Sequence, residues 1–179
     1  MFPGKIRLKL SRYIRLACRA LIPPLIKNGV TFEAHAQNVL ARFDIATKEL
    51  QGFVVRDLGG LRIHPPTLRE STGVDFQFLD GHVVATMTLE DILPKFYHTF
   101  VHSHLQRLIR LLGMHYNGLG WEMVRKYMAE VIPVEHPAWK LWMDPACKAV
   151  DSKCLMRMRM CDSYRDVSLK SILRLASTW

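Results

Sequence analysis

The chain has 179 residues, of which 49% are hydrophobic, so it is long enough for one domain with a genuine core. This composition excludes a disordered protein. Lys and Arg total 25 against 16 Asp and Glu, a net charge of +9 that predicts an anionic partner. Nucleic acid is one such partner, and the phosphates or carboxylates of small substrates are another.

Several classes are disfavoured by what the sequence lacks. No apolar run reaches the roughly 20 residues that span a bilayer, so we expect no membrane helix. The four cysteines form no C-x-x-C pair, which disfavours a zinc site and a disulfide framework and favours a cytoplasmic location. A nucleic-acid-binding domain is suggested only by charge, since no helix-turn-helix, RNP or zinc signature supports it.

The first elements are predicted from spacing and helix breakers. Leu10, Ile14, Ala17 and Leu21 recur at helical spacing, which predicts an amphipathic helix over 5–22. Residues 1–32 hold seven Lys or Arg and no acid. That composition also suits a mitochondrial transit peptide, so a mitochondrial location is the alternative, although we favour a structural helix.

A turn and a hairpin follow the helix. Pro23-Pro24 ends or kinks it, and Asn28-Gly29 forms its C-cap before a strand over 30–33. Val39 to Phe43 and Gly52 to Val55 read as the arms of a hairpin with a polar tip over 44–49. Residues 62–73 are expected to be irregular. A second hairpin is expected around Asp80-Gly81, with arms over 76–79 and 82–87.

The second half is mainly helical by its periodicity. Helices are expected over 88–112, with Thr88 as N-cap, over 120–129 and over 138–143. A strand is expected over 153–160, and the residues up to Trp179 read as a weak helix. The predicted fold class is α+β, with a small antiparallel sheet and hairpins packed against a mainly helical C-terminal half.

Two polar clusters carry the predicted chemistry. The first is Glu33-x-His35-x-Gln37-Asn38, and the second is Arg56-Asp57-Leu58-Gly59-Gly60. The hairpin would bring both clusters to its open end, where oxygens of Glu33, Asp57 and Asn38 could bind Mg²⁺. His35 and Arg56 would then donate to phosphate oxygens. The alternatives are solvated turn acids, a satisfied core or surface histidine at 35, loop-capping amides at 37 and 38, and an arginine that only orients its neighbouring carboxylate.

These segments resemble the C-terminal half of the IucA/IucC siderophore synthetases, which act independently of non-ribosomal peptide synthetases. The resemblance covers nearly the whole chain, through Pro23 to Asn38, Phe53 to Gly60, Phe96-Tyr97-His98, Asn117-Gly118 and Lys153 to Met158. It implies a palm-like domain that uses ATP and Mg²⁺ to activate a carboxylic acid, often citrate or a derivative. An amine or hydroxyl then attacks the acyl-adenylate, in a pathway of iron acquisition. The residues at Glu33 and Asp57 are implied to bind metal and triphosphate, and Gln37 and Asn38 to complete the nucleotide or metal shell.

The resemblance also implies basic residues at the acid substrate. Lys153 and Arg157 lie in the matching segment, and Arg107 and Arg110 on the long helix and Arg159 on the late strand could add bidentate contacts to carboxylates. The alternative is a solvated basic face. His98, His102 and His104 include a pair at i, i+4, but without a nearby carboxylate we favour core or interface histidines over a metal site.

Length is where the sequence departs from this family. Its members are several times longer, and their thumb and fingers portions, which clamp ATP from the other side, are expected to be absent here. We therefore expect one domain over 1–179 that is weak or inactive alone. The alternative function is a non-catalytic palm that binds a full-length synthetase, and a homodimer is a further expected assembly.

Overall fold

The computed structural model describes residues 3–79, 84–147, 149–153 and 168–171. Within these residues, helices predominate and the strands form three two-stranded antiparallel sheets, β1-β4, β2-β3 and β5-β6. The predicted α+β class is therefore confirmed. The elements in chain order are α1 (Pro3–Leu21), α2 (Pro23–Asn28), β1 (Val30–Thr31), β2 (Val39–Phe43), β3 (Leu50–Val55), the 3-10 turn η1 (Leu58–Gly60), β4 (Arg62–Ile63), α3 (Pro65–Thr72), α4 (Leu89–Tyr97), the π-helix η2 (His98–Leu105), α5 (Gln106–Leu111), α6 (Leu119–Ala129), α7 (Pro137–Trp142), β5 (Val150–Lys153) and β6 (Ser168–Ser171).

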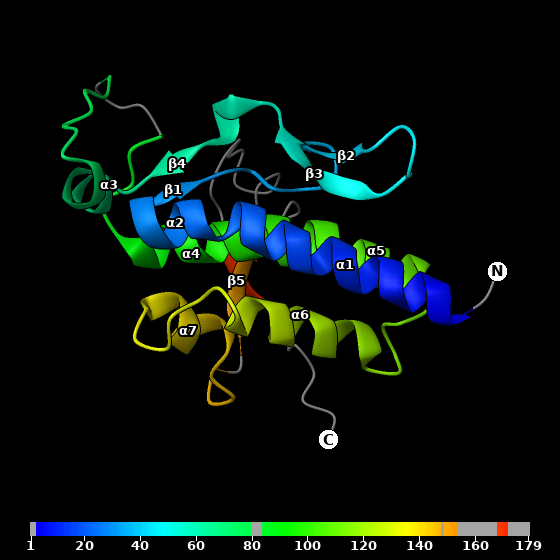
Figure 1. Ribbon diagram of the computed structural model, residues 1–179. Helices are drawn as coiled ribbons and strands as arrows, with labels where there is room; N and C mark the ends of the chain where they lie inside the picture. Colours follow the sequence, from blue (N-terminus) through cyan, green and yellow to red (C-terminus); the bar gives the residue numbers. More distant parts are fainter. Residues whose placement is uncertain (1–2, 80–83, 148, 154–167, 172–179) are drawn as a thin grey trace, which may run out of the picture.

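Helix α1 is part of the core. Its predicted apolar face is buried, with Leu10, Ile14, Ala17 and Leu21 at most 3% exposed. Figure 1 shows the helix running between the β2-β3 hairpin on one side and α6 on the other, and it packs against both. Its basic face also contacts α6, where Glu130 lies 3.6 Å from Arg15 and 3.8 Å from Arg19. This packing is that of a structural helix, the interpretation that the sequence favoured.

The long helix predicted over 88–112 is confirmed in position but is not a uniform α-helix. It is formed by α4, η2 and α5 in direct succession, with a π-helical section over His98–Leu105 in the middle. Its apolar stripe, including Phe96, Phe100, Leu105 and Ile109, is buried. A π-turn is wider than an α-turn and often marks a functional position. Here it changes which side chains of the helix share a face.

Two predictions from the first half of the chain are wrong. The stretch after β4 is helix α3, which begins at Pro65 with His64 as its N-cap and ends at Gly73 in the left-handed region (φ 73°). The expected hairpin around Asp80-Gly81 does not form in its described parts, because Phe76 to Leu79 is not a strand. Ala85 instead forms a parallel bridge with Ile63, since β4 has an open edge that accepts it.

The remaining helices confirm the predictions made from the sequence, whereas one prediction for the end of the chain is wrong. Helices α6 and α7 lie where expected. Residues 168–171 form strand β6, paired with β5, where a weak helix was expected. Most of the strand expected over 153–160, and residues 172–179, lie outside the described residues. In the part of the chain that the structure describes, no helix combines the length and apolar character needed to cross a membrane.

Candidate functional site

The open end of the β2-β3 hairpin brings the two polar clusters together, as predicted. Val39 pairs with Val55 in the last register position of the ladder. One residue further, the backbone N–H of Arg56 donates to the carbonyl of Asn38 (2.9 Å). The end of the first cluster and the start of the second are therefore hydrogen-bonded neighbours.

The loop from Glu33 to Asn38 is held by its own hydrogen bonds. The N–H of His35 donates to the carbonyl of Glu33 (3.0 Å), and the N–H of Asn38 donates to the carbonyl of His35 (3.0 Å). The Asn38 side chain is only 4% exposed, and its Nδ2 also donates to the Glu33 carbonyl (3.2 Å). This is the loop-capping alternative for Asn38, and its amide acts here as a brace of the loop.

The two candidate metal-binding carboxylates both lie beside the Gly59-Gly60 turn. Glu33 lies against Gly60 so closely that a Cβ on Gly60 would be 2.6 Å from Glu33 Oε2. Asp57 precedes the turn in the left-handed region (φ 60°), and its Oδ1 lies 3.4 Å from the position that a Cβ on Gly59 would take. The absence of a side chain at Gly60 thus makes room for Glu33, whereas a side chain at Gly59 would make only an ordinary contact with Asp57.

His35 and Arg56 differ in what they contact. His35 Nε2 lies 4.0 Å from Glu33 Oε2, and both side chains are about a quarter exposed (26% and 27%). His35 is therefore beside the carboxylate and open to a ligand. Arg56 donates from Nε to the carbonyl of Gln37 (2.8 Å), which ties the second cluster to the first. The Gln37 side chain is exposed.

The chemistry of this donor set fits Mg²⁺. Magnesium is commonly bound through one or two carboxylates, with water and phosphate oxygens at its other positions. Glu33 and Asp57, which both lie beside the Gly59-Gly60 turn, supply that number. Among the described residues, no three His, Cys, Asp or Glu side chains gather around one point, so a site of protein ligands alone is not formed there.

The hydrogen-bonded side chains of His104, which is buried, and Tyr13, which is half-buried, support this loop. His104 is 1% exposed, with Nδ1 3.1 Å from the carbonyl of Ala34 and Nε2 2.6 Å from the Tyr13 hydroxyl. A carbonyl only accepts, so Nδ1 carries the proton and Nε2 accepts from Tyr13. Burial lowers the pKa of His104 and raises that of Tyr13 to about 12, which keeps both groups neutral. Ala34 lies between Glu33 and His35, so this pair fixes the loop that carries them.

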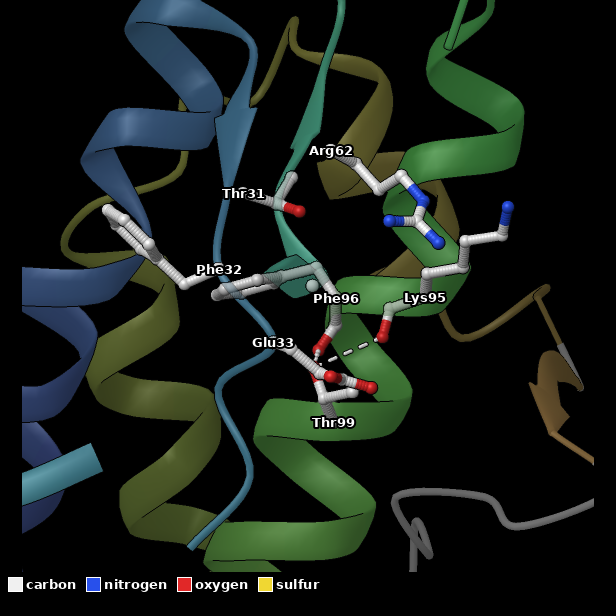
Figure 2. Close-up of a pocket in the computed structure, with 8 residues that line it drawn as sticks. Thr31, Phe32, Glu33, Arg62, Lys95, Phe96 and Thr99 are labelled. Carbon is white, nitrogen blue, oxygen red and sulfur yellow. Dashed lines mark hydrogen bonds between the residues drawn. The ribbon is translucent and has the colours of Figure 1, made fainter. Parts of the chain in front are cut away.

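A small pocket opens beside Glu33 (Figure 2). It has a volume of about 30 Å³ and is lined by Thr31, Phe32, Glu33, Gly60, Arg62, Lys95, Phe96 and Thr99. Pockets that enclose a drug-sized ligand measure roughly 300–1,000 Å³. Only one small chemical group can therefore enter here.

Among the described residues, Arg107 and Arg110 do not join this site. Arg107 is exposed on α5 and does not line the pocket. Arg110 lies over the ring of Tyr116 (5.9 Å). The backbone of Lys153 lies in β5, while Arg157 and Arg159 fall outside the described residues.

His98 and His102 are half-buried on the π-helical segment and pack against each other and against Tyr97. Their rings lie 5.7 Å apart, and His102 also contacts the edge of Tyr97 (5.0 Å). Burial lowers the pKa of His102 to about 4, with the charge of nearby His98 adding to the effect. His102 is therefore neutral at pH 7.

Comparison with known proteins identifies the family. A family model described as ferric iron reductase FhuF-like transporter matches residues 10–167. The chain is 47% identical over 157 residues to the NRPS-independent siderophore synthetase rfs of Rhizopus delemar, covering 88% of this chain and 24% of that protein. This chain belongs to the IucA/IucC siderophore synthetase family.

A further curated protein and a solved structure are also similar to this chain. A D-ornithine–citrate ligase of Staphylococcus aureus is 28% identical over 110 residues, which cover 60% of this chain and 16% of that protein. The crystal structure of the petrobactin biosynthesis protein AsbB from Bacillus anthracis has the same fold, with a TM-score of 0.65 and 13% identity over 89% of this chain and 30% of AsbB. The chain spans about a quarter of the length of the first curated relative.

Sequence reasoning missed the roles of four residues at this candidate site. Arg62 and Lys95 line the pocket, and Tyr13 and His104 support the loop. Tyr13 and His104 are 91 residues apart, so no local pattern joins them. The one available signal was Arg62, which follows the Gly59-Gly60 turn closely enough to share the site with Asp57.

Proposed function

We propose that this chain forms the part of a siderophore synthetase that activates a citrate-like carboxylic acid with ATP and Mg²⁺, for condensation with an amine or hydroxyl. The observation that carries the proposal is that Glu33 and Asp57 both lie beside the Gly59-Gly60 turn, with His35 Nε2 4.0 Å from Glu33 Oε2. Family membership supports siderophore biosynthesis and a ligase reaction. The name of the D-ornithine–citrate ligase supports a citrate-like acid and an amine as the two substrates.

The proposed reaction has two balanced steps. A carboxylate oxygen attacks the α-phosphorus of ATP, the bond to the β-phosphate oxygen breaks, and pyrophosphate leaves. The nitrogen of an amine, or the oxygen of a hydroxyl, then attacks the acyl carbon of the adenylate. AMP leaves with the electrons of the acyl–oxygen bond, and the nucleophile loses a proton.

The residues of the chain act mainly by positioning charge. Glu33 and Asp57 would hold Mg²⁺, which when bound neutralises part of the triphosphate charge. His35 would donate to the phosphate or the acyl carboxylate as charge builds at phosphorus. Asn38 and Arg56 keep the loop and turn in register through the Glu33 and Gln37 carbonyls. Positioning and charge neutralisation are the main demands of this chemistry.

The test is a titration of the chain with ATP in the presence and absence of Mg²⁺. Asp57→Asn is the informative variant, because Asn tolerates the left-handed conformation that Asp57 adopts (φ 60°), so the turn is kept while the charge is lost. We expect Mg²⁺-dependent binding that weakens by at least roughly tenfold in the variant, as for a lost charged contact. Glu70→Gln, which removes an exposed acid on α3, is the control and should bind normally.

Turnover is a separate readout. Because the chain spans about a quarter of its first curated relative, we expect nucleotide binding with slow or no release of pyrophosphate from citrate and a polyamine. Binding that is equal in wild type and Asp57→Asn would contradict the proposed role of this carboxylate. Rapid turnover by the chain alone would contradict only its expected dependence on a partner.

A second candidate function is a non-catalytic palm that associates with a longer synthetase. The outer face of the β2-β3 hairpin favours it, because the cross-strand neighbours Leu40 and Val54 are 46% and 50% exposed and Ile45 at the tip is 86% exposed. Such a face suits a protein partner. Capture of a purified full-length synthetase without any nucleotide binding would favour this candidate over the enzyme.

A further inference from the structure

The chain contains two Asn-Gly pairs that the proposed function does not use, Asn28-Gly29 and Asn117-Gly118. An asparagine followed by glycine is prone to deamidation, in which the backbone nitrogen of the glycine attacks the amide carbon of the asparagine. Glycine favours this attack because it has no Cβ to obstruct the approach. The structure places the two pairs in different surroundings, which determine whether each of them can react.

The surroundings of Asn117 favour the attack. Asn117 lies in the loop between α5 and α6, at the same end of the molecule as the start of α1 (Figure 1), and its side chain is exposed. Its Oδ1 accepts a hydrogen bond from the backbone N–H of Leu119 (3.2 Å). The ring closed by this bond contains both Asn117 Cγ and the nitrogen of Gly118, so the bond keeps the two reacting atoms near each other. A Cβ on Gly118 would meet nothing within 4 Å, so the surrounding space is open.

The surroundings of Asn28 oppose the same attack. Asn28 is half-buried at the end of α2, and the N–H of Gly29 donates to the carbonyl of Leu25 (2.9 Å). The carbonyl of Gly29 accepts from the N–H of His64 (2.8 Å). A Cβ on Gly29 would lie only 2.9 Å from the Thr67 Cβ. The attacking nitrogen is therefore engaged and crowded, and its reaction requires the helix end to open locally.

We propose that Asn117-Gly118 is a modification site, at which the backbone of the chain converts an amide to a carboxylate. The Gly118 nitrogen forms a bond to Asn117 Cγ, the bond from Cγ to Nδ2 breaks, and ammonia leaves with the proton of the Gly118 nitrogen. Water then opens the cyclic imide. Cleavage of the bond to Cγ gives aspartate, and cleavage of the bond to the backbone carbonyl carbon gives isoaspartate.

The modification would change the start of a helix that belongs to the core. Gly118 is the N-cap of α6, and α6 packs against α1. An aspartate at 117 keeps an oxygen that can accept from Leu119 and adds negative charge where a helix N-terminus favours it. An isoaspartate instead inserts a methylene group into the backbone at this point. This inference is independent of the proposed function, because it uses none of the residues of that site.

The first experiment incubates the full chain at mildly alkaline pH and follows both pairs by mass spectrometry. Trypsin releases Asn117 in peptide 111–125 and Asn28 in peptide 28–42, and fragmentation assigns the converted residue. In the folded chain we expect conversion at Asn117 to be at least roughly tenfold faster than at Asn28, because the Asn28 pair reacts only in locally opened molecules. In urea the two rates should become similar.

Two results of this incubation would overturn the proposal. One is an Asn117 that converts in urea but is protected in the folded chain. The other is a folded chain in which Asn28 converts as fast as Asn117. A rate difference that persists unchanged in urea would assign the preference to the neighbouring sequence, and would overturn the structural argument.

The second experiment compares two glycines of the same loop. Gly118→Ala adds a methyl group beside the attacking nitrogen and should slow conversion of Asn117 by roughly tenfold or more, as for a barrier raised by 1.4 kcal/mol. Gly113→Ala is the matched control, since Gly113 and Gly118 both have positive φ (69° and 76°) and open space at the Cβ position. The control imposes similar backbone strain without shielding the Gly118 nitrogen, and should convert like wild type. Equal conversion rates in the two variants would overturn the proposal.

Discussion

Histidines occupy two neighbouring regions of this molecule and do different work in each. His35, in the motif loop, is 26% exposed and lies beside a carboxylate. His104, in the π-helical segment, is 1% exposed and uses both ring nitrogens, on Tyr13 and on the Ala34 carbonyl. The difference shows how the two histidines depend on each other. His35 is available to a ligand, and the loop that carries it is held by His104, whose two ring nitrogens both have hydrogen-bond partners. The exposed loop depends on the pair His104 and Tyr13, because Ala34 connects them.

The largest expected effect on stability comes from changing the buried histidine, His104. His104→Ala should lower the free energy of unfolding by about 3 kcal/mol, because it leaves a cavity and removes the partner of two buried polar groups. His35→Ala should change it by less than about 0.5 kcal/mol, as for a surface position. Urea unfolding of both variants is the measurement. Equal losses of unfolding free energy in the two variants would contradict the view that His104 stabilises the fold while His35 is available to a ligand.

Gly60→Ala tests how closely Glu33 in the exposed motif loop must fit against the Gly59-Gly60 turn. A Cβ there would lie 2.6 Å from Glu33 Oε2 and 2.7 Å from Glu33 Cβ, so the glutamate must move. We expect a loss of about 1–3 kcal/mol in stability, as for overpacking, together with weaker Mg²⁺-dependent ATP binding. Gly52→Ala in β3 is the matched control, since nothing lies within 4 Å of its Cβ position. If both variants bind ATP equally well, the close fit of Glu33 against the turn is not needed for binding.

Tyr13→Phe isolates the hydrogen bond that links the two regions. The variant keeps the ring, which contacts Phe53 edge-on at 5.1 Å, and leaves His104 Nε2 without its donor. The free energy of unfolding should fall by about 1–2 kcal/mol. Citrate or ATP affinity should fall as well, because the loop loses part of its support. Unchanged stability would mean that this 2.6 Å contact contributes little.

The effect that is expected to be smallest near neutral pH is a pH dependence from His102. Its pKa falls from 6.5 in an unfolded chain to about 4 in the folded one, so between these values only the unfolded chain takes up the proton. The free energy of unfolding should therefore fall as the pH is lowered from 6.5 towards 4, and His102 should contribute no such change above that window. His102→Gln should show a flatter dependence across the same range. Parallel curves for wild type and variant would assign the acid sensitivity to other groups.

Local patterns predicted much of this fold. The apolar spacing of α1, the β2-β3 hairpin and helices α6 and α7 depend on periodicity and turn residues that a sequence displays directly. Helix α3 was missed although His64, Pro65 and Gly73 form its start and end signals. The prediction of a hairpin at Asp80-Gly81 was wrong because Ala85 pairs with Ile63 instead. A local turn signal does not predict such a long-range pairing.

The candidate site was likewise predictable in part, and the rest of it depends on tertiary packing. The meeting of Asn38 with Arg56 followed from the hairpin register. Asn38 itself turned out to brace the loop, because its burial and its bond to the Glu33 carbonyl depend on the packed structure. Arg62 and Lys95 reach the pocket from β4 and α4. That convergence depends on how α4 packs, which the sequence pattern did not reveal.

A double-mutant cycle on ATP binding tests the central claim that Glu33 and Asp57 act on one magnesium–nucleotide complex. Affinities are measured by calorimetry with Mg²⁺ for wild type, Glu33→Gln, Asp57→Asn and the double variant. We predict that either single change weakens binding nearly as much as both together, with a coupling free energy above about 1 kcal/mol. Losses that simply add, or a chain whose ATP binding does not respond to either carboxylate, would contradict the account.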